Sequence, residues 1–533
     1  MSRETLLKII GFCSTNPTLN FNNFFTNTSL QKDIDKRVIE YTKKNNIVEK
    51  PELVSQYASL KIAELILSNK DTLNNGFKSI DEDELNIFKA FLVINSQLNG
   101  KQKFDNLNDD NFERLVDFYL ISKFPESDLA IYENDEPEFV KLIYSTIYKV
   151  EELFKFLNSK QEFKGFKNQF IKSFKTNSDE EFIQQMKYLF GQLLISKRSK
   201  NYIFKVTDKT SFDFLKSMTS ENIELDEDFT NLKNNPIYFI DNETFSVVNY
   251  FFAVDKFYRS TKFKLKEIYN KIEILKEDYG EFFGFFKKHF SENFLMKNVL
   301  DNIFKKKHFI KKPEREKELN GEPDYYVRHG NTIFLFENKD ILVAKGIKSS
   351  ADIEKINTYL QSRFVYDGER SVGISQLVNS IKEIQEKEFR FDDYVNKKNS
   401  LKIFPILIIQ DRIFQCPGIN YRLNNWYRKI VQDELKGKYN PSNINGLTVI
   451  DIDSLIVWTP YLKQKDKNFK EILINHLHRM ERHKKINISD LKLGLYKAKQ
   501  NLTERISSIS SRQMPFYISK KMFLEKFEDV ITK

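Results

Sequence analysis

The stretch that decides the fold lies at residues 321–340 and reads GEPDYYVRHGNTIFLFENKD. Gly330-Asn331 is a strong candidate for a two-residue turn, because such a turn needs positive backbone angles that Gly and Asn tolerate. The residues on either side of the turn are rich in aromatic and β-branched types, which favour strands. The pattern predicts a β-hairpin with strands at 323–329 and 332–339.

A two-residue turn also fixes which residues face each other across the hairpin. Counting outward from it, Asp324 faces Glu337, and one pair further Glu322 faces Lys339. Because side chains alternate faces along a strand, these four polar residues project from one face at the open end of the hairpin. The residues predicted to project from the other face are Tyr325, Val327, Phe334 and Phe336.

This polar cluster needs a physical reason, because two carboxylates that face each other disfavour strand pairing by about 0.2–1 kcal/mol. A divalent cation between Asp324 and Glu337 would remove the repulsion, and Mg²⁺ is typically held by one or two carboxylates together with water and substrate phosphate. The ion would polarise a phosphodiester and lower the pKa of an attacking water. Lys339 would orient that water or stabilise transition-state charge.

The same residues carry a family resemblance. Pro323-Asp324, followed by an apolar strand that ends in Glu337-Asn338-Lys339, resembles the PD-(D/E)xK nuclease superfamily, which has the restriction-endonuclease-like fold. The resemblance implies a mixed sheet flanked by helices and an endonuclease that uses Mg²⁺, with Mn²⁺ as a substitute. It also implies that Asp324, Glu337 and the backbone carbonyl of Asn338 bind the metal, and that Lys339 is catalytic.

Two further residues follow from the resemblance, which covers residues 280–415. Members of the superfamily often have a metal-binding glutamate on the helix before the sheet, and Glu292 is the best match, with Glu281 as the alternative. Many members also have a glutamine on the helix after the motif, and Gln376 matches that catalytic position. Residues 340–371 would then be an insertion.

Changes of pattern divide the rest of the chain. The predicted parts are a mainly helical region at 1–200, a small β-containing connector at 201–265, the nuclease domain at 266–460 and a basic helical segment at 461–533. The expected fold class therefore combines α+β and α/β features: a helical N-terminal region, then a mixed sheet flanked by helices, then a basic helical segment.

Apolar spacing and turn signals predict individual elements outside the hairpin. The predicted helices are 57–67, 139–158, a broken segment at 264–307, 352–364, 372–388 and 420–436. The predicted strands are 236–240, 244–252, 307–312, 401–410 and 447–458.

The charge balance is compatible with a nucleic-acid partner. The net charge is +10, although 75 acidic residues are interspersed with the basic ones. The residues predicted to contact substrate phosphates are Lys345, Lys348, Arg479, Arg482, Lys484 and Lys485. Three neighbouring histidines, His476, His478 and His483, are interpreted as part of a basic helical face and not as metal ligands.

Partners and location follow from weaker signals. Two cysteines and the lack of a long apolar run predict a cytoplasmic protein with no membrane association. DNA is predicted ahead of RNA, because most of the superfamily cleaves DNA. Residues 1–260 are expected to recognise a protein partner or trigger, and a homo-oligomer is one expected form, because cutting both strands takes two sites. By analogy, the nuclease is expected to act in bacterial defence against phage or foreign DNA.

Three alternatives stay open at this point. The chain could be a ribonuclease, a non-catalytic nucleic-acid-binding protein with a nuclease-like fold, or a protein-interaction scaffold on which the hairpin carboxylates merely lie on a solvated face. Substitution of Asp324 or Lys339 separates a nuclease from an inert binding protein, because binding would survive and cleavage would not. The scaffold alternative predicts no metal dependence of either stability or activity.

Overall fold

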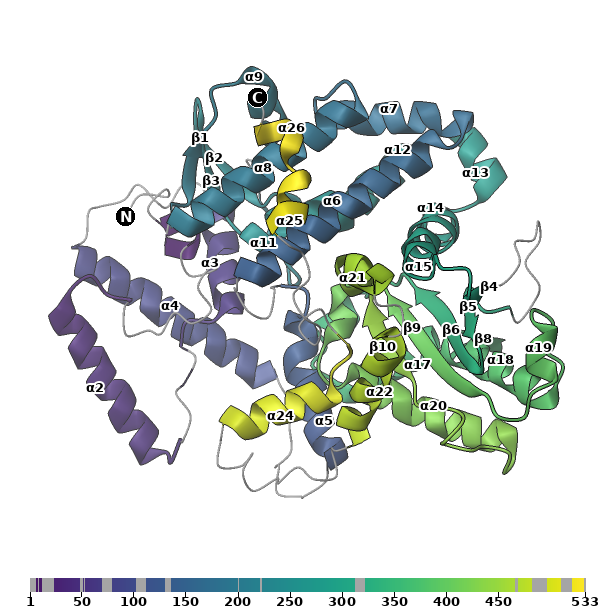
Figure 1. Ribbon diagram of the computed structural model, residues 1–533. Helices are drawn as coiled ribbons and strands as arrows, with labels where there is room; N and C mark the ends of the chain where they lie inside the picture. Colours follow the sequence, from purple (N-terminus) through teal and green to yellow (C-terminus); the bar gives the residue numbers. More distant parts are fainter. Residues whose placement is uncertain are drawn as a thin grey trace. The chain divides into compact units, whose positions relative to one another are not determined.

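The computed structural model describes residues 6–7, 9–11, 24–47, 51, 53–69, 79–101, 112–129, 136–199, 201–220, 223–311, 322–464, 468–481, 496–509 and 520–531. The fold is mixed α/β and mainly helical, with a five-stranded mixed sheet (Figure 1). Within these residues, every helix is too short or too polar to cross a membrane.

Contacts along the chain define two compact units. The first unit comprises Met1–Lys103, Asp128–Phe282 and Lys520–Lys533, and the second comprises Phe104–Ser127 and Phe283–Ser519. The sequence placed the join near residue 265 and kept each part continuous. Two segments depart from that order. The C-terminal segment Lys520–Lys533 belongs to the first unit, and α5 (Phe112–Lys123) packs in the core of the second unit through Val116 and Leu120. Such long-range packing leaves no mark in local spacing.

The first unit is built of helices around an aromatic core. Its longer described helices are α2 (Thr28–Lys44), α3 (Gln56–Ser68), α4 (Ile80–Lys101), α6 (Glu136–Asn158), α7 (Lys164–Ser173) and α8 (Asp179–Ser199). The predicted helices at 57–67 and 139–158 are thereby confirmed as α3 and α6. The ring of Phe182 lies within 6.0 Å of five others, Phe154, Phe170, Phe174, Phe214 and Phe257. These contacts account for part of the high Phe content.

A three-stranded sheet also belongs to the first unit, in the order β1 (Ile203–Lys205), β3 (Thr244–Val247), β2 (Ile237–Asp241). The predicted strand at 244–252 is wrong beyond Val247, because β3 ends there and α11 (Tyr250–Asp255) begins three residues later. Asn249 caps this helix by accepting the N–H of Phe252 at 2.9 Å. An apolar run fits a strand and a buried helix equally well, and the capping residue decides between them.

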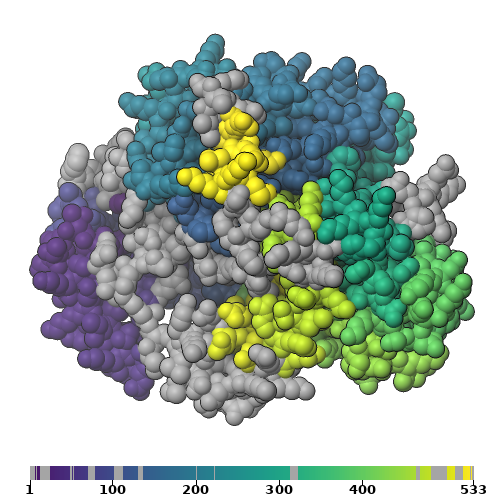
Figure 2. Space-filling view, in the orientation of Figure 1, coloured from purple at the N-terminus to yellow at the C-terminus, as the bar shows by residue number. Residues whose placement is uncertain are grey.

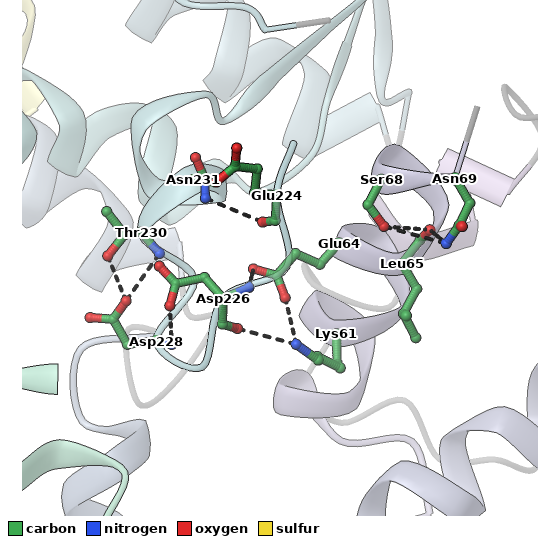
Figure 3. Close-up of polar contacts among 10 residues, drawn as sticks. All are labelled: Lys61, Glu64, Leu65, Ser68, Asn69, Glu224, Asp226, Asp228, Thr230 and Asn231. Carbon is green, nitrogen blue, oxygen red and sulfur yellow. Dashed lines mark hydrogen bonds and ion pairs between the residues drawn. The ribbon is translucent and has the colours of Figure 1, made fainter. Parts of the chain in front are cut away.

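Figure 3 shows how α3 is tied to the loop before α10 (Thr230–Asn234). The buried carboxylate of Glu64 accepts the Lys61 ammonium at 2.7 Å and the backbone N–H of Asp226 at 3.1 Å. Lys61 also donates to the Asp226 carbonyl. This buried charge is fully partnered, as buried charges in proteins normally are.

The second unit contains the five-stranded sheet, in the order β10 (Thr448–Asp451), β9 (Lys402–Ile409), β6 (Thr332–Lys339), β5 (Tyr325–His329), β4 (Ile310–Lys311). The first three run parallel, and β5 and β4 are antiparallel additions. Helices cover both faces (Figure 1). The main ones are α15 (Lys297–Ile303), α17 (Ile353–Phe364), α18 (Ile374–Glu386), α20 (Ile419–Leu435), α21 (Ile452–Gln464) and α22 (Asn468–Glu481). All of β6 is buried.

The hairpin has the predicted register. His329 pairs with Thr332, Val327 pairs with Phe334, and pairing ends at Tyr325 and Phe336. Gly330 has the positive φ of 56° that the turn requires. The two faces also differ as predicted: Ile333 and Leu335 join the core that includes α17 and α18, while the rings of Phe334 and Phe336 both contact the ring of Phe469 in α22.

The predicted strand at 447–458 is wrong in its second half. β10 ends at Asp451, and Ile452 begins the buried helix α21. The carboxylate of Asp451 accepts the backbone N–H of Ser454 at 2.8 Å, which is how an aspartate begins a helix. The segment LTVIDIDSLIVW (447–458) is apolar almost throughout. Buried strands and buried helices are both apolar, so the sequence does not show where the strand changes to a helix.

Candidate active site at the end of strand β6

Three parallel strands end together at one edge of the sheet. Lys339 of β6 pairs with Ile409 of β9, which pairs with Asp451 of β10. Glu337, Asn338 and Lys339 are all buried there. The carboxyl edge of parallel strands is where α/β proteins commonly place their sites.

Asp324 lies one residue before β5, where pairing with β6 has stopped. Its carboxylate accepts the backbone N–H of Asn338 at 2.7 Å, so a side chain replaces the hydrogen bond that a longer strand would supply. Continuing the register from Tyr325 places Asp324 opposite Glu337, as the turn predicts. The position of Glu322 opposite Lys339 lies beyond the last paired residue and stays a prediction.

Glu337 has the least satisfied carboxylate in this neighbourhood. The side chain is fully buried, and neither oxygen accepts a hydrogen bond from any described residue. The nearest ammonium, that of Lys339, lies 3.6 Å away. Burial raises the pKa of Glu337 well above its ordinary value, and the negative charge of Asp324 raises it further, while Lys339 opposes the rise. These surroundings favour the protonated form of Glu337.

Lys339 is held in place by the first turn of α18. Its ammonium donates to the side-chain oxygen of Gln376 at 3.2 Å, and the same oxygen accepts the backbone N–H of Gly373 at 2.7 Å. The glutamine singled out from the sequence therefore touches the lysine. The contact orients the ammonium towards Glu337 without adding charge to the site.

Gly373 lets α18 come this close. Its φ is +52°, and a β-carbon there would lie 2.8 Å from Cε of Lys339 and 2.9 Å from the carbonyl oxygen of Phe364. Only glycine fits both the backbone conformation and the space. Lys339 and Gln376 can meet because Gly373 has no side chain to fill the space beside Lys339 and the end of α17.

Asn338 presents its backbone to the site and its side chain to β9. Gln410 donates to the side-chain oxygen of Asn338 at 2.8 Å. The N–H and C=O of one strand residue point to the same neighbouring strand, so the Asn338 carbonyl points to the side of Asp324. That is the direction which the resemblance implies for a metal-binding carbonyl.

A π-helix, η5 (Phe286–Met296), packs against β6 and brings Glu292 and Lys287 to the site. The charge of Glu292 raises the pKa of Glu337, and Lys287 interacts with the charges of Lys339 and Asp324. Sequence reasoning missed Lys287, because π-helical spacing does not follow the 3.6-residue period.

Within the described part of the chain, no three His, Cys, Asp or Glu residues form a group that could hold a metal ion. Glu292, Asp324 and Glu337 are therefore not found as a group of three ligands, and the assignment of Glu292 as a metal ligand stays a prediction. The alternative, Glu281, is exposed and belongs to the first unit.

The predicted phosphate contacts are only partly at the surface. Lys345 is exposed at the start of α16 (Lys345–Lys348), but Lys348 is buried with its ammonium covered. Its assignment as a surface contact is therefore wrong, because α16 turns that side chain inward. Arg479 is half-buried, and burial lowers its pKa. Arg482, Lys484 and Lys485 lie outside the described residues.

The basic C-terminal segment is more structural than predicted. Figure 2 shows α22 and α24 (Tyr496–Ile506), in yellow-green to yellow, at the surface of this face. On the inner side of α22, however, His476 is fully buried, with its Nε2 atom 3.2 Å from the side-chain oxygen of Asn420. The interpretation of His476 as part of a basic surface is wrong. His483 lies outside the described residues.

No protein-family model, curated protein or solved structure matches this chain. The function is therefore inferred from the chemistry of the residues at the end of β6. Those residues are a carboxylate pair, a backbone carbonyl and an oriented lysine.

We predict that Glu337→Gln stabilises the protein in EDTA by about 1–3 kcal/mol, because it removes a buried carboxylate that accepts no hydrogen bond. The unfolded carboxyl ionises near pH ~4.3. The folded one ionises only at higher pH. Relative to the variant, the wild type is therefore most stable below pH ~4.3. It loses this stability as the pH rises from there through the pKa of Glu337 in the folded protein. Thermal melts of both proteins in EDTA, from roughly pH 4 to 8, measure this difference in stability. Parallel pH profiles for the two proteins would contradict the prediction.

We also predict that Gly373→Ala lowers the free energy of unfolding by about 1–3 kcal/mol, because the new methyl group would overlap Lys339 and the Phe364 carbonyl. Gly346→Ala is the matched control, since a β-carbon at Gly346 meets nothing within 4 Å. Urea denaturation compares the two. Equal stability of both variants would show that α18 does not need its close approach to β6.

Proposed function

We propose that this protein is a metal-dependent nuclease whose active site lies at the end of β6. One observation carries the proposal: the Glu337 carboxylate is fully buried opposite Asp324, and both of its oxygens lack a hydrogen-bond donor among the described residues. Leaving an ionised carboxylate unpaired in a protein interior costs several kcal/mol. A bound cation removes that cost. The burial also argues against a scaffold with solvated carboxylates.

The donor set fits Mg²⁺. Asp324 and Glu337 supply carboxylate oxygens, and the Asn338 carbonyl points to the same side. Oxygen donors of this kind suit Mg²⁺ and Mn²⁺ better than zinc, whose sites are usually built on His nitrogen or Cys sulfur atoms. A pair of carboxylates is the usual number for Mg²⁺, which keeps several positions for water and for substrate phosphate.

When bound, the ion supplies Lewis-acid chemistry to a phosphodiester and acidifies water. The chain's own residues do the rest. Gln376 holds the Lys339 ammonium beside Glu337, where it can stabilise the charge that develops on the phosphate oxygens or hold the attacking water. The hydrogen bond from the Asn338 N–H fixes Asp324 before substrate arrives. Burial of Glu337 and Lys339 keeps bulk water from weakening these interactions.

The substrate that we propose is DNA, which the resemblance to the PD-(D/E)xK superfamily favours over RNA. The helical first unit, separate in its core from the sheet, is proposed to recognise the partner or trigger that governs cleavage. A role in defence against phage or foreign DNA fits such an arrangement. The two alternatives are cleavage of RNA and binding of nucleic acid without cleavage, and one experiment distinguishes them from cleavage of DNA.

The deciding experiment incubates the full chain with plasmid and linear DNA in Mg²⁺, Mn²⁺ or EDTA. We expect cleavage with either metal and none in EDTA. Lys339→Ala should slow cleavage about 10²–10³-fold, which is the usual effect of removing one group that stabilises transition-state charge. Lys397→Ala, which removes an exposed lysine of the same unit, should cut like the wild type.

Other outcomes have defined meanings. Cleavage of RNA alone would keep the site and change the substrate. Metal-independent cleavage, or equal rates for Lys339→Ala and wild type, would refute the assignment of this site. DNA binding without cleavage in any metal would point to the inert binding protein.

A further inference from the structure

The turn of the hairpin lies at the opposite end of β6 from the proposed active site, and both of its residues, Gly330 and Asn331, are exposed. Two segments from other parts of the second unit contact this turn and the residue before it. In the loop between α15 and β4, the ring centroid of His308 lies 4.7 Å from that of His329. Tyr394 of α19 (Asp393–Asn396) donates its hydroxyl to the side-chain oxygen of Asn331 at 3.1 Å. Elements that are distant in the sequence therefore meet at the turn.

The loop that carries His308 also presents three consecutive lysines, at residues 305–307, and all three are exposed. The aromatic residues that flank the loop, Phe304 and Phe309, are buried, and their ring centroids lie 5.0 Å apart. The two rings hold both ends of the loop against the core of the second unit. A loop that is already held in this way loses little conformational entropy when its side chains meet a ligand.

Two more lysines approach the same turn from the β9 side of the sheet. Lys402, the exposed first residue of β9, pairs with Thr332 and donates its backbone N–H to the Asn331 carbonyl at 2.8 Å. The ammonium of Lys398 lies 4.9 Å from the centre of the Tyr394 ring, which itself contacts the turn. Lysines from two separate segments therefore gather around one exposed turn.

These two segments carry an excess of positive charge. Residues 304–309 and 392–402 contain six lysines and two acidic residues, Asp392 and Asp393. The Asp392 carboxylate accepts hydrogen bonds from the Arg328 guanidinium at 2.5 Å and from the Tyr326 hydroxyl at 2.8 Å. Its charge is compensated by Arg328 and does not balance the lysines. A surface with this excess of positive charge suits a polyanion.

Protection of a sheet edge is a second reason for lysines at such a place. β4 is an edge strand, and lysines near an edge discourage pairing with other chains. That explanation covers residues 305–307, which lead into β4. It does not cover Lys398 and Lys402, because β9 lies in the interior of the sheet. The gathering of both sets at one turn favours a shared ligand.

We propose that the hairpin turn, with the lysines at 305–307, Lys398 and Lys402, binds the phosphate backbone of nucleic acid at a distance from the cut. The inference rests on the proposed function for the class of ligand. Glu337 and Thr332 are five residues apart on β6, which corresponds to about 17 Å. A duplex that reaches both places extends about five base pairs beyond the cleaved bond. Because lysines contact phosphates and not bases here, the contact is independent of sequence.

The first test measures binding of the full chain to a labelled DNA duplex in EDTA, by fluorescence anisotropy at several salt concentrations. Each lost phosphate contact lowers the slope of log affinity against log salt by about 0.9. The triple variant Lys305→Gln, Lys306→Gln, Lys307→Gln should therefore have a slope smaller by about 2–3 and bind about 10–100-fold more weakly at ~0.1 M salt. Duplexes of unrelated sequence should lose affinity equally.

Two further variants sharpen this comparison. The double variant Lys398→Gln, Lys402→Gln should lower the slope by about 1–2, although neither residue is near the β4 edge. Lys32→Gln, Lys43→Gln and Lys44→Gln together remove three exposed lysines of α2, in the first unit, and should bind like the wild type. Wild-type affinity and slope in the triple variant would overturn the inference. Aggregation of that variant with unchanged affinity would assign residues 305–307 to edge protection instead.

Cleavage separates the two proposals. The turn lysines should raise KM for metal-dependent cleavage when substituted and leave kcat unchanged, because they bind substrate without taking part in the chemical step. A wild type that cuts DNA, beside a triple variant with the same KM and affinity, would remove only the contact at the turn. A wild type that binds DNA through these lysines and cuts nothing would remove the nuclease and keep the contact. Thermal melts confirm that each variant is folded before it is compared.

Discussion

The central constraint in the second unit is a buried carboxylate, that of Glu337, whose oxygens accept no hydrogen bond from any residue that the structure describes. Glu337 stands in a strand buried along its whole length, where apolar residues are the stable choice. The fold places Asp324 across from it, so two carboxyl groups face each other at the end of β6. This local conflict is destabilising while both groups are ionised, and a proton or a cation relieves it.

Each neighbouring element answers a different part of that conflict. The β5 end contributes Asp324, which is held by a backbone N–H of β6. The first turn of α18 contributes Gln376, which orients Lys339, and the close approach depends on Gly373. The helix η5 adds a lysine and a glutamate by π-helical spacing. Local rules of strand composition and helix geometry are broken where these elements meet, as is expected at functional sites.

The hairpin was predictable because its turn and its strands depend on residues that are close together in the sequence. The Gly330-Asn331 turn fixed the hairpin register, which in turn placed Asp324 opposite Glu337. What escaped prediction depends on packing. Continuous apolar sequence concealed the start of α21 after Asp451, and helix orientation turned Lys348 inward and buried His476. Lys287 was invisible because its helix does not follow the common period. The restriction-endonuclease-like fold itself stays a prediction; the structure establishes the mixed sheet with helices on both faces.

The most direct test of the central claim is the proton released when Mg²⁺ binds. If Glu337 is protonated in the metal-free protein, an entering cation must displace that proton. Titration of Mg²⁺ into weakly buffered protein, from roughly pH 5 to 7, should release up to about one proton per chain, and Glu337→Gln should release none. Saturable Mg²⁺ binding with equal proton release from both proteins would contradict the claim. So would the absence of any binding by the wild type.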